Sequence, residues 1–168
     1  MRAQRQNRDD GGMTSTQGSE SATGLNAVVG VDGSENSRAA LNWALHHVAG
    51  HGGGSVRAVM SWTYAPVAAA GYGFGGSLPP AESMEEATKG ALDALLETVT
   101  APEGVEVVPV VREGAPSHVV LDEGEGADLI VLGKRGHGGF LGLLIGSVAT
   151  QVANHASCPV VIVPAHHD

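Results

Sequence analysis

The chain has 168 residues, which suits one domain with a continuous hydrophobic core and is too short for two ordinary domains. Its formal net charge of −9 argues against binding nucleic acid over a broad basic surface, because neutralising phosphates requires clustered Lys and Arg. No run approaches the ~20 apolar residues that are needed to span a bilayer. We therefore expect neither nucleic acid nor a membrane among the partners.

The first residues and the cysteine content indicate the compartment. Residues 1–24 are rich in Gly, Ser, Thr, Gln and Arg and have almost no large apolar side chain, which predicts a disordered tail before a folded domain over residues 25–168. The first 25 residues lack the apolar run of a secretion signal. A lone Cys158 excludes an internal disulfide framework and suits a reducing compartment, so we expect a cytoplasmic protein.

The first half of the domain alternates strand and helix patterns. In chain order these are a strand over residues 25–31, a helix from Ser34 or Ser37 to about Gly50, a strand over 55–62 and a helix over about 81–100. The second helix is expected to bury an apolar face formed by Met84, Ala87, Ala91, Leu95 and Val99. The long connection from Thr63 to Pro80 is either a lid over a ligand or a surface excursion.

The second half of the domain continues this alternation. It comprises a strand over 105–111, a short helix over 116–123, a strand over 127–132, a helix over 147–156 and a strand over 159–163. Pro109 cannot donate to a central ladder, so the strand that contains it should lie at a sheet edge. Strands that alternate with helices predict right-handed crossovers and a parallel sheet, which places the chain in the α/β class.

The segment between Gly133 and Ser147 indicates the chemistry. It leaves the carboxyl end of a predicted strand and enters the amino end of a helix, where open α/β sheets bind ligands. Its glycines let the main chain approach an anion closely and adopt positive φ, while the first amides of the helix supply hydrogen-bond donors. Ser147 is expected both to cap that helix and to reach a phosphate oxygen. The segment therefore predicts a phosphate-binding loop.

Two common phosphate-binding motifs do not fit this segment. A Walker loop requires G-x-x-x-x-G-K-[ST], but Lys134 after Gly133 is followed by Arg135. A dinucleotide fingerprint would place G-x-G-x-x-G after the first strand, where the sequence reads Gly30-Val31-Asp32-Gly33. The loop must therefore belong to another type.

The spacing of the loop resembles the nucleotide signature of the universal stress protein family, G-2x-G-9x-G-[S/T], with Gly133, Gly136, Gly146 and Ser147 at its fixed positions. Residues 28–34, 127–133 and 158–164 are also similar to that family and occur in the same order. The resemblance covers about residues 27–164. Because family members without the signature do not bind ATP, the resemblance implies an ATP-binding member.

The resemblance implies a single Rossmann-like domain of the adenine nucleotide alpha hydrolase-like type, with a five-stranded parallel sheet in the order 3-2-1-4-5 and helices on both faces. In that order the third strand lies at an edge, in agreement with the position of Pro109. The first and fourth strands lie side by side at the switch point, which brings Asp32 and Gly133 to one crevice.

The resemblance also implies roles for individual residues. Gly30 and Asp32 would contact adenine or ribose, Ser61 would border the base, and the glycine loop would surround the ribose and phosphates of ATP, with or without Mg²⁺. The implied nucleotide-binding residues are Gly30, Asp32, Ser61, Gly133, Lys134, Arg135, Gly136, His137, Gly138, Gly139, Gly146, Ser147 and Val148. Lys134 stands where many members have a small residue, so it is either a phosphate contact or a solvated side chain.

Some of these residues admit plainer interpretations. Asp32 could instead end a strand and cap the first helix, Arg135 could be an exposed charge, and His137 could be an incidental loop residue rather than a general base. His47 and His51 lie four residues apart, with Gly50 between them and no third ligand at zinc-like spacing. We therefore expect no metal site.

The resemblance, together with the glycine loop, implies an ATP-binding regulatory protein of the stress response. No carboxylate is evidently placed to orient water against a γ-phosphate, so any hydrolysis should be slow and no catalytic residue is assigned. Two alternatives stay open: a weak ATPase or an enzyme that phosphorylates itself at or near Ser147, and an interaction module that needs no nucleotide. The apolar strand Pro159–Pro164 would leave unpaired main-chain groups at a sheet edge, and the resemblance implies that two copies pair there as a homodimer.

Overall fold

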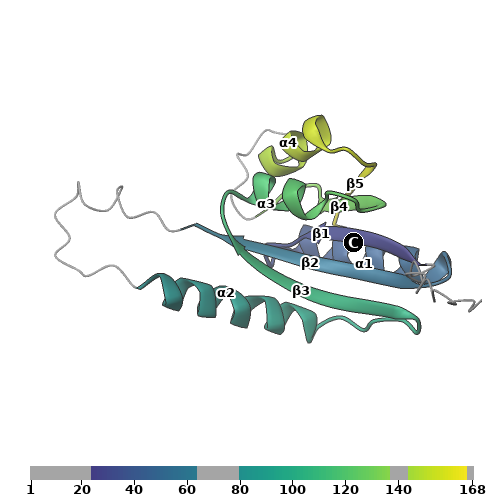
Figure 1. Cartoon of the computed structure of the whole chain (residues 1–168), viewed down its shortest axis with the longest axis horizontal. Coiled ribbons are helices and arrows are strands. Elements are labelled where there is room, and N and C mark those ends of the chain that lie inside the picture. Colours follow the sequence, from purple (N-terminus) through teal and green to yellow (C-terminus); the bar gives the residue numbers. More distant parts are fainter. Residues whose placement is uncertain (1–23, 64–79, 137–143, 166–168) are drawn as a thin grey trace, which may run out of the picture.

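The computed structural model describes residues 24–63, 80–136 and 144–165. It contains one five-stranded sheet in the order β3-β2-β1-β4-β5, in which every neighbouring pair of strands is parallel (Figure 1). The elements are β1 (Leu25–Gly30), α1 (Glu35–Gly50), β2 (Gly54–Trp62), α2 (Ala81–Leu96), β3 (Val105–Glu113), α3 (Pro116–Glu123), β4 (Leu129–Gly133), α4 (Ser147–His155) and β5 (Val160–Val163). The predicted sheet order and α/β class are confirmed. The expected tail and most of the long connection before α2 lie outside the described residues.

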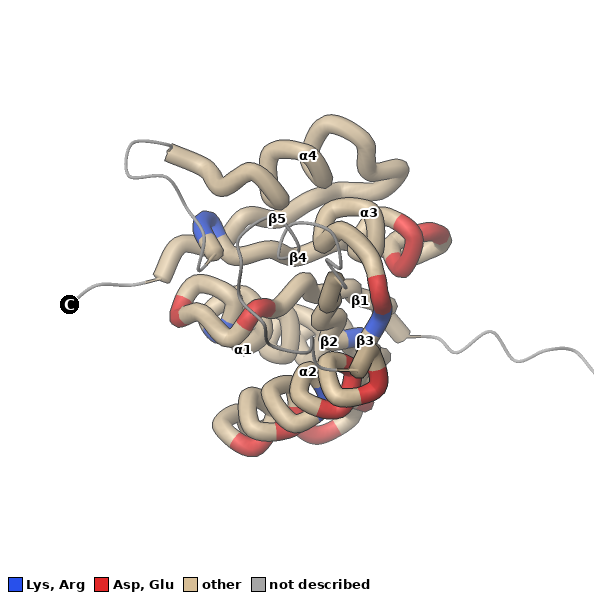
Figure 2. Tube along the Cα trace, turned by 90° about the vertical axis from the view of Figure 1, so that its left-hand side faces the viewer, with Lys and Arg blue, Asp and Glu red and all other residues tan. Residues whose placement is uncertain are grey.

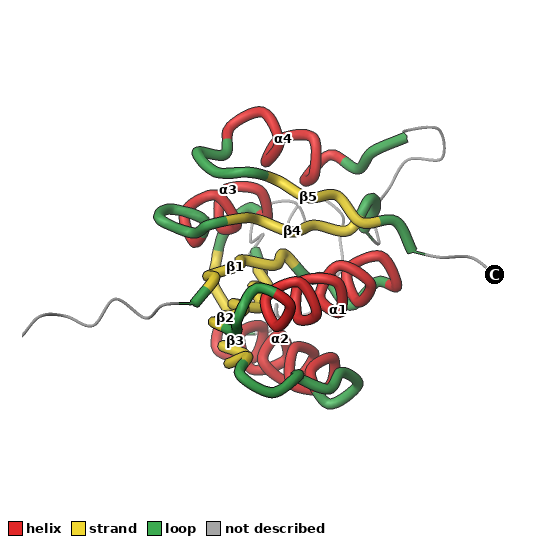
Figure 3. Tube along the Cα trace, turned by 90° about the vertical axis from the view of Figure 1, so that its right-hand side faces the viewer, coloured by secondary structure: helices red, strands yellow, loops and turns green. Residues whose placement is uncertain are grey.

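Helices cover both faces of the sheet (Figure 3). The α1 and α2 helices pack on one face around Leu41 and Leu45, and α3 and α4 pack on the other around Val28 and Val152. Val28 and Val29 of β1 enter opposite cores, as the two-residue period of a strand requires. Burial on both faces explains why β1 and β4 have almost unbroken apolar sequences. None of the described helices is long and apolar enough to cross a membrane.

The α1 helix begins at Glu35, directly after Ser34, which is one of the two starting positions that the sequence predicts. Ser34 is its N-cap, and the Ser34 Oγ accepts a hydrogen bond from the main-chain N–H of Ser37 at 3.2 Å. The residues that α1 buries recur at helical spacing and are Ser37, Ala40, Leu41, Ala44, Leu45 and Val48. This buried stripe holds the first turn of α1 against Gly133 at the end of β4.

The α2 helix departs from the prediction in its length and in its buried face. It ends at Leu96, four residues earlier than expected, and it buries Leu92 and Leu95 while Ala91 is exposed. Leu95 is buried as predicted, but Leu92 takes the place that was expected for Ala91, because a leucine removes more apolar surface from water than an alanine. Acidic residues gather along the same helix (Figure 2).

The two edges of the sheet are β3 and β5. Pro109 in β3 is exposed and stands in register with Ala58 of β2, which confirms that this proline marks an edge strand. The β5 strand is short, and in the described sheet it pairs with β4 on one side. The centre of the sheet is therefore β1, which lies between β2 and β4.

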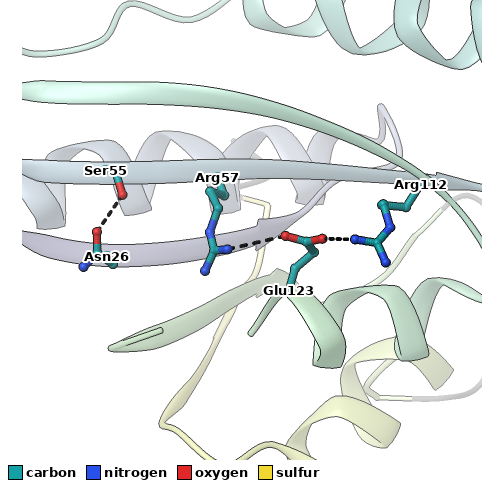
Figure 4. Close-up of polar contacts among 5 residues, drawn as sticks. All are labelled: Asn26, Ser55, Arg57, Arg112 and Glu123. Carbon is teal, nitrogen blue, oxygen red and sulfur yellow. Dashed lines mark hydrogen bonds and ion pairs between the residues drawn. The ribbon is translucent and has the colours of Figure 1, made fainter. Parts of the chain in front are cut away.

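An ion-pair cluster anchors the end of α3 to the sheet (Figure 4). The Glu123 carboxylate contacts the guanidinium of Arg57 in β2 at 3.4 Å and that of Arg112 in β3 at 2.6 Å. The Glu123 side chain is 12% exposed, so water screens these contacts less than it screens a fully exposed pair. Val120 lies one turn earlier on the same helix and borders the cleft at the carboxyl end of the sheet. The cluster thus helps to fix one wall of that cleft.

Candidate functional site

A cleft of about 270 Å³ opens at the carboxyl ends of β1 and β4. The chain leaves β1 for α1 on one face of the sheet and leaves β4 for α4 on the other, which is the arrangement that creates ligand-binding crevices in open α/β sheets. Most of the residues that the sequence predicted for a nucleotide line this cleft. They are Gly30, Asp32, Ser61, Gly133, Arg135, Gly136, Gly146, Ser147 and Val148. His137, Gly138 and Gly139 lie outside the described residues.

The cleft has an apolar interior and a polar rim. Val59, Val120 and Leu132 line it and are buried, whereas Asp32 and Arg135 line it and are exposed. The floor at Gly30 is close-packed. A Cβ atom added at this glycine would lie 2.6 Å from Leu132 Cδ2 and 2.9 Å from Val120 Cγ2. The cleft can therefore hold a flat apolar group inside and a charged group at its mouth.

Two motifs that are far apart in the sequence meet at the rim. A Cβ atom on Gly136 would overlap Oδ2 of Asp32, so the glycine lets the loop lie directly against this carboxylate. Oδ1 of Asp32 accepts a hydrogen bond from the main-chain N–H of Ser34 at 3.0 Å. Asp32 therefore shapes the turn before α1 and also borders the cleft.

Two of the three signature glycines permit close packing, and none of the three has an unusual backbone angle. Gly133, Gly136 and Gly146 are not among the described glycines with positive φ, so the expectation of positive φ is wrong for these three. A Cβ atom on Gly133 would lie 2.6 Å from the carbonyl carbon of Asn36 in α1. A Cβ atom on Gly146 would meet Arg135 Cα at an ordinary 3.5 Å. Two of the glycines thus serve contacts within the protein, and the third leaves space at the cleft.

The main chain of Lys134 joins the loop to its neighbours. Its N–H donates to the carbonyl of Val163 in β5 at 2.7 Å, and its carbonyl accepts a hydrogen bond from the N–H of Gly146 at 2.9 Å. The two ends of the segment between Gly133 and Gly146 therefore lie side by side. Lys134 is half-buried and is not among the residues that line the cleft, so the contacts that the structure gives it come from its main chain.

Ser147 is the first residue of α4 and does not cap it, contrary to the prediction. Gly146 is the N-cap, with an extended φ of −67° and ψ of 158°, and no side chain caps this helix. The Gly146 carbonyl accepts the first helical hydrogen bond, from the N–H of Thr150 at 2.9 Å, which leaves Ser147 inside the helix. Ser147 is exposed and borders the cleft, at a helix end that favours anions.

Part of the lining was missed by sequence reasoning. These residues are Val31, Ser37, Val59, Pro116, Val120, Leu132 and Ala149. Most of them are apolar and read as core, so no local pattern distinguishes them from other buried residues. Ser37 did have a signal, because it is a polar residue on the buried stripe of α1.

The other chemistry-bearing groups among the described residues form no metal site. Within residues 24–63, 80–136 and 144–165, no group of three or more His, Cys, Asp and Glu could hold a metal ion. Despite Gly50 between them, the rings of His47 and His51 lie against each other at a tilt of 39°, with centroids 4.2 Å apart. Trp43 stacks on His47, with ring centroids 4.5 Å apart. Burial raises the pKa of the Cys158 thiol, and the Asp128 carboxylate raises it further, which lowers the thiolate fraction at neutral pH.

Comparison with known proteins identifies relatives over most of the chain. The model of the universal stress protein family matches residues 25–164. A universal stress protein from Mycolicibacterium smegmatis is 31% identical over 155 residues, and the match covers 86% of this chain and 49% of that protein. The chain therefore spans about half the length of this curated relative.

Solved structures share the fold. A universal stress protein in complex with cAMP is 25% identical with a TM-score of 0.51, and the match covers 86% of this chain and 100% of that chain. A universal stress protein family protein from Arabidopsis thaliana with AMP bound is 19% identical with a TM-score of 0.58, and the match covers 86% and 94%. Given the family match from residue 25 to residue 164, the chain belongs to the universal stress protein family.

Proposed function

We propose that this chain binds ATP in the cleft at the ends of β1 and β4 and acts as a regulatory nucleotide-binding protein of the stress response. The observation that supports this most directly is the meeting of Asp32 and Gly136 at the rim, beside the amino end of α4. At this place the carboxylate of Asp32 can accept a hydrogen bond from a ligand hydroxyl, and the main-chain N–H groups at the amino end of α4 can donate to a phosphate. The family structures described with cAMP and AMP support an adenine nucleotide as the ligand.

The cleft offers a place for each part of ATP. The buried side chains of Val59, Val120 and Leu132 can enclose a flat base. Arg135 and Ser147 are exposed at the mouth, where a guanidinium and a hydroxyl can hydrogen-bond to phosphate oxygens. A volume of about 270 Å³ suits the nucleoside, so the phosphates would extend over the rim.

The lining favours binding over fast hydrolysis. Of the described residues that border the cleft, Asp32 is the one with a carboxylate. Mg²⁺ is usually held by carboxylates together with substrate phosphates, so an ion bound with ATP would depend mainly on the phosphates. Fast phosphoryl transfer also needs a group that orients the attacking water. We therefore propose slow or no turnover, with a weak ATPase, self-phosphorylation at Ser147 and a nucleotide-independent interaction module as the alternatives to be tested.

The first test uses nucleotide that co-purifies with the protein and nucleotide added to it. Mass spectrometry of the small molecules released on denaturation should detect an adenine nucleotide, and calorimetry should detect ATP binding. Gly146→Val should abolish binding, because the valine side chain would occupy space at the mouth of the cleft that the glycine leaves open. The variant should stay folded, because the backbone angles at position 146 suit a β-branched residue and a Cβ there meets the protein at ordinary distances. Gly90→Val is the control, since Gly90 lies on α2 with open space around it and should leave ATP affinity unchanged.

The outcomes separate the proposal from its alternatives. Equal ATP affinity in the wild type and Gly146→Val would contradict the assignment of the site. Wild-type protein without released or bound nucleotide would favour the interaction module. Steady release of ADP over many turnovers would favour an ATPase, and a stable phosphate on Ser147 would favour self-phosphorylation.

We also propose that the protein works in the cytoplasm as a homodimer. The free Cys158 suits a reducing compartment. The support for the dimer is β5, which forms one edge of the described sheet and in which Val160, Val161 and Ile162 are only half-buried. An apolar edge strand of this kind presents main-chain groups that can pair with a second copy.

A further inference from the structure

Two serines, Ser37 and Ser117, are the buried polar residues in the part of the chain that the structure describes, with exposed fractions of 3% and 5%. Of the two, Ser37 alone borders the cleft, at the first turn of α1. The other positions on the buried stripe of α1 are apolar, and a polar group among them is unfavourable unless its hydrogen bonds are satisfied. The partners of the Ser37 hydroxyl therefore show what it can offer a ligand.

The proton of the Ser37 hydroxyl is already used within the protein. Its Oγ donates to the main-chain carbonyl of Ser34 at 2.9 Å, and a carbonyl oxygen can only accept. The main-chain N–H of Ser37 donates separately to Ser34 Oγ at 3.2 Å. A hydroxyl has one proton and two lone pairs, so the Ser37 oxygen keeps its acceptor capacity and has no proton left for a ligand.

The adjacent rim of the cleft has the same polarity. Asp32 lies in the turn before α1 and borders the same cleft with a carboxylate, which accepts hydrogen bonds. A ligand group that contacts the Ser37 oxygen must therefore donate a hydrogen bond, and a phosphate, which presents acceptor oxygens, cannot do so. An adenine nucleotide has two kinds of donor, the amino group of the base and the hydroxyls of the ribose.

We propose that Ser37 is a specificity-determining residue of the cleft and that it accepts a hydrogen bond from a nucleoside donor, either the adenine amino group or a ribose hydroxyl. The inference rests on the proposed binding of ATP in this cleft. A ligand without the contacted donor, such as one with a carbonyl in place of the amino group, would leave the Ser37 oxygen facing another acceptor or empty space. Ser37 thus selects ligands through a bond that phosphates cannot make.

Calorimetry with ATP, inosine triphosphate, 2′-deoxy-ATP and 3′-deoxy-ATP distinguishes the donors. Ser37→Ala should weaken ATP binding about five- to tenfold, which corresponds to the loss of one hydrogen bond. For the analogue that lacks the contacted donor, the variant should bind no more weakly than the wild type, because the bond is already absent and the variant has no oxygen to face a second acceptor. Inosine triphosphate reports on the amino group, and the two deoxynucleotides report on the hydroxyls.

Ser117→Ala is the matched control, because Ser117 is buried to a similar degree on α3 and does not border the cleft. It should leave all four affinities unchanged. An equal loss for all four ligands in Ser37→Ala would show a structural role and overturn the inference, and so would an unchanged affinity for ATP; both results leave ATP binding itself in place. Wild-type protein that bound none of the four ligands would overturn the proposed function together with this inference.

Discussion

The three glycines of the nucleotide signature have different roles in this site. Gly133 allows the end of β4 to touch Asn36, and Gly136 allows the loop to lie against Asp32. Gly146 has ordinary surroundings and leaves the mouth of the cleft open. The glycines of the signature can therefore be separated by experiment into those that serve folding and one that serves ligand binding.

Gly133→Ala should lower the free energy of unfolding by about 1–3 kcal/mol, because the added methyl group would lie 2.6 Å from main-chain atoms that cannot move without shifting α1. Gly146→Ala should change the same quantity by less than about 0.5 kcal/mol, since its Cβ contacts are ordinary. Urea unfolding with an unchanged slope measures both effects. Equal losses in the two variants would refute this division of roles.

The residues of the site were more predictable than their contacts. The spacing of Gly133, Gly136 and Gly146 can be read from the chain, but the contact between Gly136 and Asp32 depends on β1 and β4 being neighbours. The expected cap at Ser147 was wrong because a glycine in extended conformation precedes it, and local sequence does not decide which of the two residues starts the helix.

At the scale of elements, α3 is short, and Glu123 anchors its last turn to the sheet. Glu123→Gln should lower the free energy of unfolding by about 1 kcal/mol, because it removes the charge that Arg57 and Arg112 share at a carboxylate side chain that is 12% exposed. Glu85→Gln is the matched control, since Glu85 and Lys89 pair at 2.6 Å on α2 with both side chains about half exposed. This control should have no detectable effect in urea unfolding, and a loss as large as that of Glu123→Gln would contradict the prediction.

The elements themselves were largely predictable because their signals are local. The N-cap at Ser34 and the proline at the start of α3 mark helix starts within a few residues of sequence. The buried face of α2 was predictable only in part: Leu95 was expected and Leu92 was not, since in a helix rich in alanine the packing of a few leucines decides which side faces the core. The Glu123 cluster was not predicted either, because it needs the register that sets Arg57 opposite Val108.

At the scale of the whole molecule, the sheet order decides which segments can build a site. With β1 beside β4 in the middle, the turn after β1 and the loop after β4 open at one cleft, while β3 and β5 are left as edges. The exposed Pro109 protects the β3 edge, but the apolar β5 edge has no proline within its span. The β5 strand is also hydrogen-bonded to the loop through Lys134, so the proposed dimer edge adjoins the proposed nucleotide site.

The direction of the main-chain groups in β5 decides which substitution tests the dimer. The carbonyls of Pro159 and Val163 accept hydrogen bonds from the side of β4. Residues two apart in a strand direct their main-chain groups to the same neighbour, so Val161 also faces β4, whereas the N–H of Ile162 faces the open edge. A proline at position 162 therefore affects only the open edge, and a proline at position 161 affects the pairing with β4.

Ile162→Pro should convert the homodimer into a folded monomer, because it removes a donor from the open edge and leaves the ladder between β4 and β5 intact. Val161→Pro is the contrasting variant and should lower the free energy of unfolding, because it removes a donor from that ladder. Light scattering at micromolar concentration measures the mass, and urea unfolding shows whether each variant is folded. A monomeric wild type, or an Ile162→Pro variant that stays dimeric, would rule out pairing through β5.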